Sequence, residues 1–246
     1  MAQTARFFTE PKTIFRDRFL LNDPAVCRHL RQILRIKKGQ QIVLFDGQGY
    51  EYDAEIRFLT KEQVSGVILN KKNVFENWPH VILAQALPKA GKADEIVRMN
   101  TEVGVKEFVF FKSEYSVPKK DSYDEKKLER LGRVIAEAGR QSERSFLPIV
   151  NPVIDFDELM DMDVEVKIIL NSRNVDGSIP LNEVHLKNKQ AKSFLLLVGP
   201  EGGFSKTEIE QAKVHNFNIA YLNTPILRTE TAGVVAAGYL IINSGN

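Results

Sequence analysis

Cysteine and histidine are scarce in this sequence of 246 residues. Cys27 is the only cysteine, which excludes an intrachain disulfide and a cysteine-based metal site and indicates a reducing compartment. We interpret Cys27 itself as a packed core residue. The histidines show no metal-ligand spacing, and we therefore expect no metal; they stand at His29, His80, His185 and His215.

Long apolar runs and targeting segments are also lacking. No run approaches the ~20 apolar residues of a membrane-spanning helix, and residues 1–6 have none of the apolar character of a secretion signal. The composition, 43% hydrophobic and 27% charged, is that of an ordinary globular protein with one large domain or two small ones. We expect a cytoplasmic protein with no membrane partner.

Two nucleotide-binding fingerprints are missing as well. The glycine-rich segment 199–203 is not followed by the Gly-Lys-Ser/Thr of a P-loop, and no Gly-x-Gly-x-x-Gly follows a predicted strand. The sequence therefore excludes a P-loop and a dinucleotide-binding turn.

Positive charge is concentrated near the N-terminus. Residues 1–73 hold thirteen Lys or Arg and eight Asp or Glu, a formal charge of +5, whereas the whole chain carries +2. A basic domain beside a near-neutral one indicates a polyanion partner, most commonly nucleic acid. A solvated basic face with no partner is the alternative.

Residues 1–73 are predicted to form a small β-barrel domain. Segments 42–45, 50–56 and 64–69 have the pattern of short strands separated by turns. A short helix, capped by Asp23 and continuing through Arg35, interrupts them. Its helical spacing places Arg28, Arg31 and Arg35 on one face, which suits phosphate contact.

Residues 74–246 are predicted to form an α/β domain, and 74–79 is a candidate linker. Strands are expected at 81–87, 108–111, 166–170, 194–198 and 219–222, and helices at 92–103, 125–142, 205–215 and 232–242. The alternation predicts a mainly parallel sheet with helices on both faces. A capping box at Ser205 and Glu208 defines the third of these helices.

Two loops follow neighbouring strands near the C-terminus: residues 199–204 and residues 223–231. Ligands bind outside the carboxyl ends of strands in open α/β sheets, so the two loops predict one pocket. Simple tight turns, with Thr229 or Thr231 as a helix cap, are the alternative. Arg228 has no such local explanation.

The residues of these loops resemble the bacterial RsmE family, whose members are 16S rRNA uridine-N3 methyltransferases of the SPOUT (α/β-knot) superfamily. The principal motifs are Leu-Val-Gly-Pro-Glu-Gly-Gly-Phe-Ser at 197–205 and Ile-Leu-Arg-Thr-Glu-Thr-Ala at 226–232. Segments 86–89, 101–105, 113–117 and 137–144 also match, so the resemblance spans nearly the whole chain.

The resemblance implies a PUA-like RNA-binding β-barrel followed by a SPOUT domain with a C-terminal trefoil knot. It also implies a homodimer and S-adenosylmethionine as cofactor. The implied cofactor-binding residues are Leu170, Asn171, Gly199, Pro200, Glu201, Gly202, Gly203, Leu222, Ile226, Leu227, Arg228, Thr229, Thr231 and Ala232. With the basic residues above, it places RNA contacts at Arg6, Arg28, Arg31, Arg35, Gln141 and Arg144.

Methyl transfer to uracil N3 requires loss of the N3 proton, which suggests catalytic roles. We expect Arg228 to stabilise the developing uracil oxyanion, supported by Arg144 of the neighbouring subunit, with Glu201 and Glu230 as rival general bases. The alternatives are a ribose 2′-O-methyltransferase of the same superfamily and a non-catalytic RNA-binding assembly protein.

The chain departs from the family pattern at two places. Residues 222–225 read Leu-Asn-Thr-Pro where the family has Leu-Gly-Pro-Arg, and Asn100 stands where the family has lysine. Both departures remove positive charge from the expected RNA path.

Overall fold

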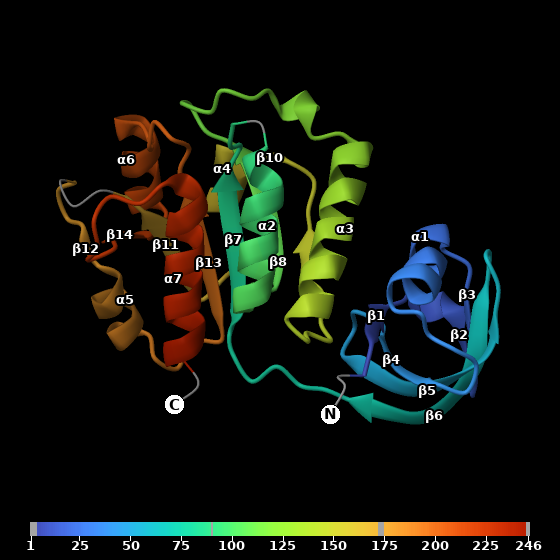
Figure 1. Ribbon diagram of the computed structural model, residues 1–246. Coiled ribbons are helices and arrows are strands. Elements are labelled where there is room, and N and C mark those ends of the chain that lie inside the picture. The colour runs from blue at the N-terminus through green and yellow to red at the C-terminus, as the bar shows by residue number, and fades with distance from the viewer. Residues whose placement is uncertain (1–3, 90, 172–174, 245–246) are drawn as a thin grey trace. The chain divides into compact units, whose positions relative to one another are not determined.

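The computed structural model describes residues 4–89, 91–171 and 175–244, and the chain forms two compact units (Figure 1). The first unit consists of Met1–Glu76 together with Gly139–Leu147, and the second of Asn77–Ala138 and Pro148–Asn246. The sequence pattern instead predicts a boundary after residue 73 and assigns residues 139–147 to the second domain. The expected loop 171–174 lies, apart from Asn171, outside the described residues.

The first unit is built on a six-stranded sheet in the order β1-β4-β5-β6-β3-β2. Its strands are β1 (Arg6–Phe8), β2 (Ile14–Phe15), β3 (Arg18–Leu21), β4 (Gln41–Phe45), β5 (Tyr50–Leu59) and β6 (Val64–Asn73). Alternation along β5 buries Tyr52, Ala54 and Ile56 against one core, as a period of two requires. The three strands predicted for this region are confirmed as β4, β5 and β6.

The predicted helix of this unit is confirmed at its start and wrong at its end. Asp23 caps α1 (Pro24–Arg28): its carboxylate accepts hydrogen bonds from the backbone N–H groups of Ala25 and Val26 at 2.7 and 3.2 Å. The chain then widens into the π-helical turn η2 (His29–Ile33), and Arg35 has a φ of 51°. Because this left-handed conformation breaks a right-handed helix, the continuous arginine face does not form.

Residues 139–147 complete the first unit through backbone contacts. The N–H of Gly49 donates to the Ser145 carbonyl at 3.0 Å, and the N–H of Leu147 donates to Gly47 at 2.9 Å. Gly49 has a φ of 96°, and a Cβ there would lie 2.2 Å from the Phe146 ring. Only glycine therefore permits this approach.

The second unit is built on an eight-stranded sheet in the order β10-β8-β7-β13-β11-β14-β12, with β9 beside β8. Every described pairing in it is parallel. Its strands are β7 (His80–Ala86), β8 (Glu107–Lys112), β9 (Ile149–Val150), β10 (Ile154–Asp155), β11 (Val166–Leu170), β12 (Ile179–Pro180), β13 (Ser193–Val198) and β14 (Asn218–Tyr221). The predicted parallel sheet is confirmed.

Helices cover both faces of this sheet (Figure 1). They are α2 (Lys92–Val103), α3 (Glu125–Gln141), α4 (Phe156–Met160), α5 (Leu181–Lys187), α6 (Lys206–Val214) and α7 (Thr229–Asn243), with a short 3-10 turn η3 (Lys120–Ser122). Another 3-10 turn, η1 (Pro11–Thr13), belongs to the first unit. Ile82, Ala84 and Ala86 of β7 share a core with α4 and α6, whereas Leu83 faces α7 at Gly233. Burial on both faces explains why the strands are continuously apolar. In the part of the chain that the structure describes, no helix is long and apolar enough to cross a bilayer.

Candidate functional site

The sheet order brings the two predicted loops together. Strand β11 lies between β13 and β14, and Leu170 at its end pairs with Val198 of β13 and Ala220 of β14. Three carboxyl ends therefore open at one edge of the sheet, where ligands bind in α/β folds. Asn171 is fixed there by donating its backbone N–H to the Ala220 carbonyl at 2.8 Å.

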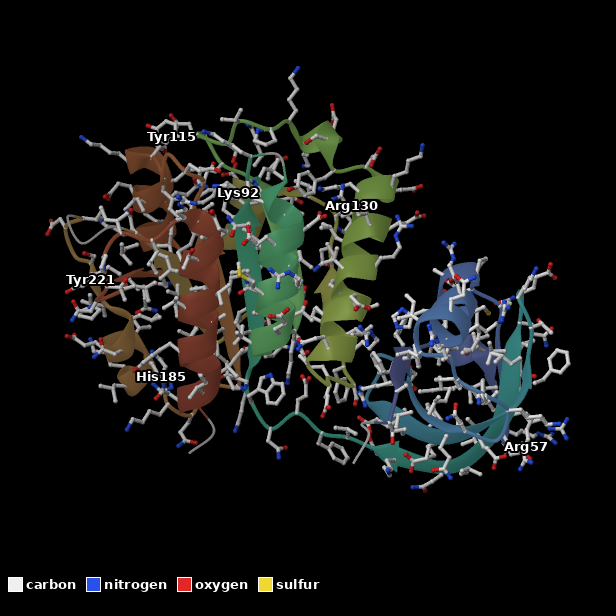
Figure 2. The ribbon with its side chains drawn as sticks, viewed as in Figure 1. Arg57, Lys92, Tyr115, Arg130, His185 and Tyr221 are labelled. Carbon is white, nitrogen blue, oxygen red and sulfur yellow. The ribbon has the colours of Figure 1, made fainter. Side chains whose placement is uncertain are left out.

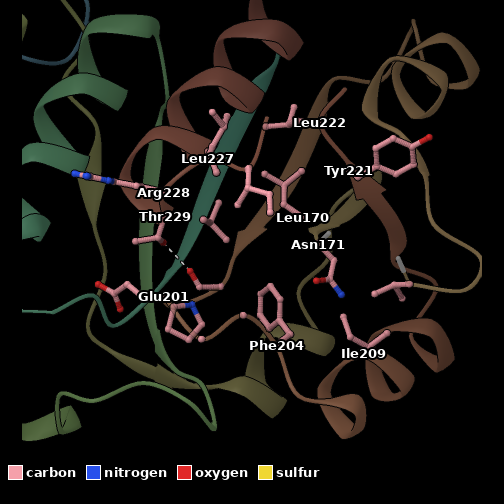
Figure 3. Close-up of a pocket in the computed structure, with 18 of the residues that line it drawn as sticks. Leu170, Asn171, Glu201, Phe204, Ile209, Tyr221, Leu222, Leu227, Arg228 and Thr229 are labelled. Carbon is pink, nitrogen blue, oxygen red and sulfur yellow. Dashed lines mark hydrogen bonds between the residues drawn. The ribbon is translucent and has the colours of Figure 1, made fainter. Parts of the chain in front are cut away.

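The loops enclose a cavity of about 1530 Å³ (Figure 3). Most of the expected cofactor-binding residues line it: Leu170, Asn171, Gly199, Pro200, Glu201, Gly202, Gly203, Leu222, Ile226, Leu227, Arg228, Thr229 and Ala232. Thr231 is exposed and does not belong to this lining. Other lining residues, which were not predicted from the sequence, include Lys92, Phe204, Ile209 and Tyr221.

The first of the two loops, residues 199–204, is called the glycine loop. It is held by its own backbone and by an aromatic cluster. Gly203 has a φ of 74° and donates its N–H to the Pro200 carbonyl at 2.9 Å, which closes a turn. Phe204 then packs beside Phe111 and Phe156, with ring centroids 6.3 and 6.2 Å away. The predicted capping box follows: Ser205 Oγ accepts from the Glu208 N–H at 3.2 Å, and Glu208 accepts from the Ser205 N–H at 2.8 Å.

Thr229 links the second loop to the first. Its hydroxyl donates to the Gly199 carbonyl at 2.6 Å and accepts a hydrogen bond from Gln85 Nε2 at 2.9 Å. The N-cap residue of α7 is Arg228, without a side-chain cap, so the alternative in which Thr229 or Thr231 caps this helix is wrong. Thr229 is 7% exposed, and its hydroxyl is fully engaged in joining β7, β13 and α7.

Replacing Thr229 with valine should lower the free energy of unfolding by about 1–3 kcal/mol. Valine keeps the shape but leaves the buried Gln85 amide and the Gly199 carbonyl without this partner. Urea unfolding measures the change. Thr231→Val is the matched control, because Thr231 is exposed two residues later and should change the value by less than about 0.5 kcal/mol. Equal effects of the two variants would contradict the assigned role.

Acidic and basic side chains meet at the mouth of the cavity. Lys92 Nζ lies 3.0 Å from Glu201 and 3.0 Å from Glu230. Burial raises the pKa of Glu201, but backbone N–H groups and the Lys92 ammonium outweigh it, and the pKa lies below its usual value. The same balance lowers the pKa of Glu230, to which Arg228 also contributes. Both carboxylates are therefore ionised at neutral pH.

Arg228 itself is exposed at the cavity rim, and its side chain points away from Leu170 and Asn171 (Figure 3). The guanidinium is thus open to a molecule outside the apolar part of the cavity. That position suits a group that meets substrate at the cavity mouth.

None of the expected RNA-binding residues is among the described residues that line this cavity. Arg6, Gln141 and Arg144 belong to the first unit. Arg144 is 6% exposed and binds Glu76 at 2.8 Å, and Arg6 binds Glu51 at 2.7 Å. Both guanidinium groups therefore form ion pairs within that unit. Arg28 and Arg35 are exposed, and Arg31 is half-buried.

The departure at Asn100 has no consequence for an RNA path. Asn100 is fully buried in α2, where its side chain donates to the Ile96 carbonyl at 2.9 Å. The side chain at this position therefore faces the interior of the second unit. Residues 223–225 do line the cavity, so the second departure lies at the site.

Comparison with known proteins identifies the family. The model of an RNA methyltransferase domain matches residues 76–241, and that of an RNA methyltransferase PUA domain matches residues 21–69. The ribosomal RNA small subunit methyltransferase E of Bacillus subtilis is 30% identical over 214 residues, covering 85% of this chain and 84% of that protein. Its namesake from Aquifex aeolicus is 30% identical over 236 residues, covering 96% and 98%.

A solved structure agrees. The crystal structure of a ribosomal RNA small subunit methyltransferase E from Neisseria gonorrhoeae, bound to S-adenosyl methionine, superposes with a TM-score of 0.84 at 26% identity and covers 96% of each chain. The similarity extends over both units and nearly the full length of these relatives. The chain therefore belongs to the ribosomal RNA small subunit methyltransferase E family, the RsmE family.

Proposed function

We propose that this protein transfers a methyl group from S-adenosylmethionine to N3 of a uridine in 16S rRNA of the small ribosomal subunit. One observation carries the proposal: the two motif loops of an RsmE-family chain enclose a cavity at the carboxyl ends of β13, β11 and β14. The Neisseria gonorrhoeae relative is described with S-adenosyl methionine bound, which supports the same cofactor here.

The residues present fit such a cofactor. Leu170, Leu222 and Leu227 form an apolar wall suited to an adenine ring, while the glycine loop presents backbone polar groups at the opposite side. Gly199, Gly202 and Gly203 keep that backbone accessible. When bound, S-adenosylmethionine supplies a methyl group already activated by its sulfonium.

The chain must then orient the uracil and accommodate the charge left when the N3 proton departs. Arg228 is suited to stabilise that charge on the uracil oxygens, because its guanidinium is exposed at the cavity mouth. Glu201 and Glu230 are poorer general bases than the sequence analysis supposed, because Lys92 binds both and lowers their proton affinity. The contact with Glu76 likewise disfavours Arg144 as a group that reaches a neighbouring subunit's site.

The pH dependence of methylation should separate these roles. A glutamate whose pKa lies below the usual value of 4.5 is already fully ionised at about pH 6. A methylation rate that depends on its ionised form would therefore be constant from about pH 6 to 9. If the proton leaves to solvent and Arg228 stabilises the anion, the rate should rise up to about tenfold per pH unit over that range. We expect the rising profile in single-turnover measurements. A flat profile would indicate that one of the two glutamates acts as the general base.

Several further features of the proposal follow from family membership. The first unit would be a PUA-like barrel that contacts RNA, the second would contain the trefoil knot, and the enzyme would work as a homodimer in the cytoplasm. The PUA-domain match at residues 21–69 supports the first of these. The exposed Arg28 and Arg35 remain its candidate phosphate contacts.

Incubation with labelled S-adenosylmethionine and small ribosomal subunits tests the function. We expect label in 16S rRNA, at a uridine whose pairing edge is accessible. Mass analysis of the product nucleoside should place the methyl group on the base. A methyl group on the ribose would favour a 2′-O-methyltransferase, and absence of cofactor binding by calorimetry would favour a non-catalytic assembly protein.

A further inference from the structure

One lysine joins the two loops of the cavity. Lys92 Nζ lies 3.0 Å from Oε1 of Glu201, in the glycine loop, and 3.0 Å from Oε2 of Glu230, in the first turn of α7. The side chains are 28%, 25% and 9% exposed, so the group is largely shielded from water. The contact with Glu230 is an ion pair without hydrogen-bond alignment, since this oxygen has no hydrogen-bond partner among the described residues.

The lysine comes from a third, independently anchored segment. Lys92 is the first residue of α2, and Figure 2 shows it at the top of that helix. Ala93, Ile96 and Val97 bury α2, which packs against α7. Lys92 therefore has a fixed base from which to hold both carboxylates. The backbone N–H of Lys89 adds a long contact to Glu201, at 3.4 Å.

The same segment of chain fixes the loops a second time. Gln85, at the end of β7, donates through Nε2 to Thr229 and, at 3.4 Å, to the Val198 carbonyl. Gln85 thus joins the second loop to the end of β13 by neutral hydrogen bonds, and Lys92 joins it to the glycine loop by charged pairs. Two such attachments define the distance between the loops better than either alone.

Charge balance makes the lysine necessary. Two carboxylates that share one ammonium lie close enough to repel strongly if the ammonium is removed. Arg228 offers only partial relief, because it is exposed and acts on Glu230 alone. The charged groups of the cluster thus come from the start of α2, the glycine loop and the start of α7.

We infer that Lys92 is a positioning residue of the methyltransferase, whose ammonium holds Glu201 and Glu230 together and so sets the separation of the two cofactor loops. The inference rests on the proposed function, because it assigns these loops to S-adenosylmethionine. It gives Lys92 no contact with reacting atoms. It also assigns the two glutamates to loop geometry rather than to proton transfer.

The test compares cofactor affinity in three variants by titration calorimetry at pH 8. Lys92→Met keeps the stem and removes the charge, and we expect it to weaken S-adenosylmethionine binding by about tenfold or more. Lys92→Arg restores the charge and should bind within about threefold of the wild type. Lys92→Met combined with Glu230→Gln removes the repulsion and should recover most of the loss.

A pH series and a matched control sharpen the result. In Lys92→Met the loss of affinity for S-adenosylmethionine should become smaller as the pH falls from 8 to 5.5, because one of the facing carboxylates takes up a proton. The wild-type affinity should stay constant over this range. Arg98→Met is the control: it removes an ion pair with Glu102, 3.2 Å long, from the same helix and should leave affinity unchanged.

Each remaining outcome opposes the inference. Wild-type affinity in Lys92→Met would show that the ion pairs do not set the loop separation. A loss that neither arginine nor the double variant relieves would show that Lys92 acts by direct contact or through folding, which the unfolding midpoint would identify. If the wild-type protein binds no S-adenosylmethionine, the proposed function fails first and this inference fails with it.

Discussion

Replacing Arg228 with alanine should lower the methylation rate by about 10²–10³-fold, the usual effect of removing a group that stabilises an oxyanion. The affinity for S-adenosylmethionine should change by less than about threefold, because the side chain points away from the apolar part of the cavity. Single-turnover kinetics with small ribosomal subunits measures the first quantity and calorimetry the second.

Arg228→Lys is the matched control for this variant. It keeps the positive charge but loses the planar guanidinium, and so should recover only part of the rate. Because Arg228 is exposed, neither substitution should shift the unfolding midpoint appreciably. An alanine variant that methylates at the wild-type rate would remove Arg228 from the mechanism.

Truncating Phe111 to alanine should have the largest effect on stability, a loss of about 3–5 kcal/mol in the free energy of unfolding. Phe111 is fully buried near the end of β8, and its ring centroid lies 5.8 Å from that of Phe156 and 6.3 Å from that of Phe204. The cavity left behind would remove a packing partner of Phe204, the last residue of the glycine loop, and so destabilise that loop. Urea unfolding monitored by circular dichroism measures the loss.

An exposed phenylalanine provides the comparison. Phe15 is 57% exposed in the first unit, and Phe15→Ala should change the free energy of unfolding by less than about 0.5 kcal/mol. Phe111→Leu should fall between the two, since leucine fills part of the space. A Phe111→Ala loss below about 1 kcal/mol would mean that the aromatic cluster does not support the site.

The α/β unit was predictable because each of its signals is local. The apolar run at 194–198 and the capping box at Ser205 are each readable within about six residues, and β13 and α6 begin and end close to the expected positions. Burial of both sheet faces removes the ambiguity of a half-exposed strand. The pairing of the two loops also followed, because parallel strands leave their carboxyl ends at one edge.

Features that depend on distant contacts were missed. Nothing around Lys92 distinguishes it from a surface lysine, since the carboxylates it binds are more than a hundred positions away in sequence. Arg144 was likewise expected to contact RNA from the family resemblance, because its buried pairing with Glu76 joins positions that are far apart in sequence. The helical spacing of Arg28, Arg31 and Arg35 was real, but a left-handed residue at Arg35 overrode it. Short elements such as α4 and α5 gave too few periods to detect.

The segment 139–147 has a consequence for biosynthesis. A chain emerging from the ribosome presents residues 1–76 first, but the groove around Gly49 stays unfilled until Phe146 has been made. By then β7, α2 and β8 have already been synthesised. The N-terminal unit therefore cannot finish folding until residues 139–147 have been made, after part of the second unit, and a fragment ending at residue 76 would lack the Arg144 guanidinium that Glu76 binds.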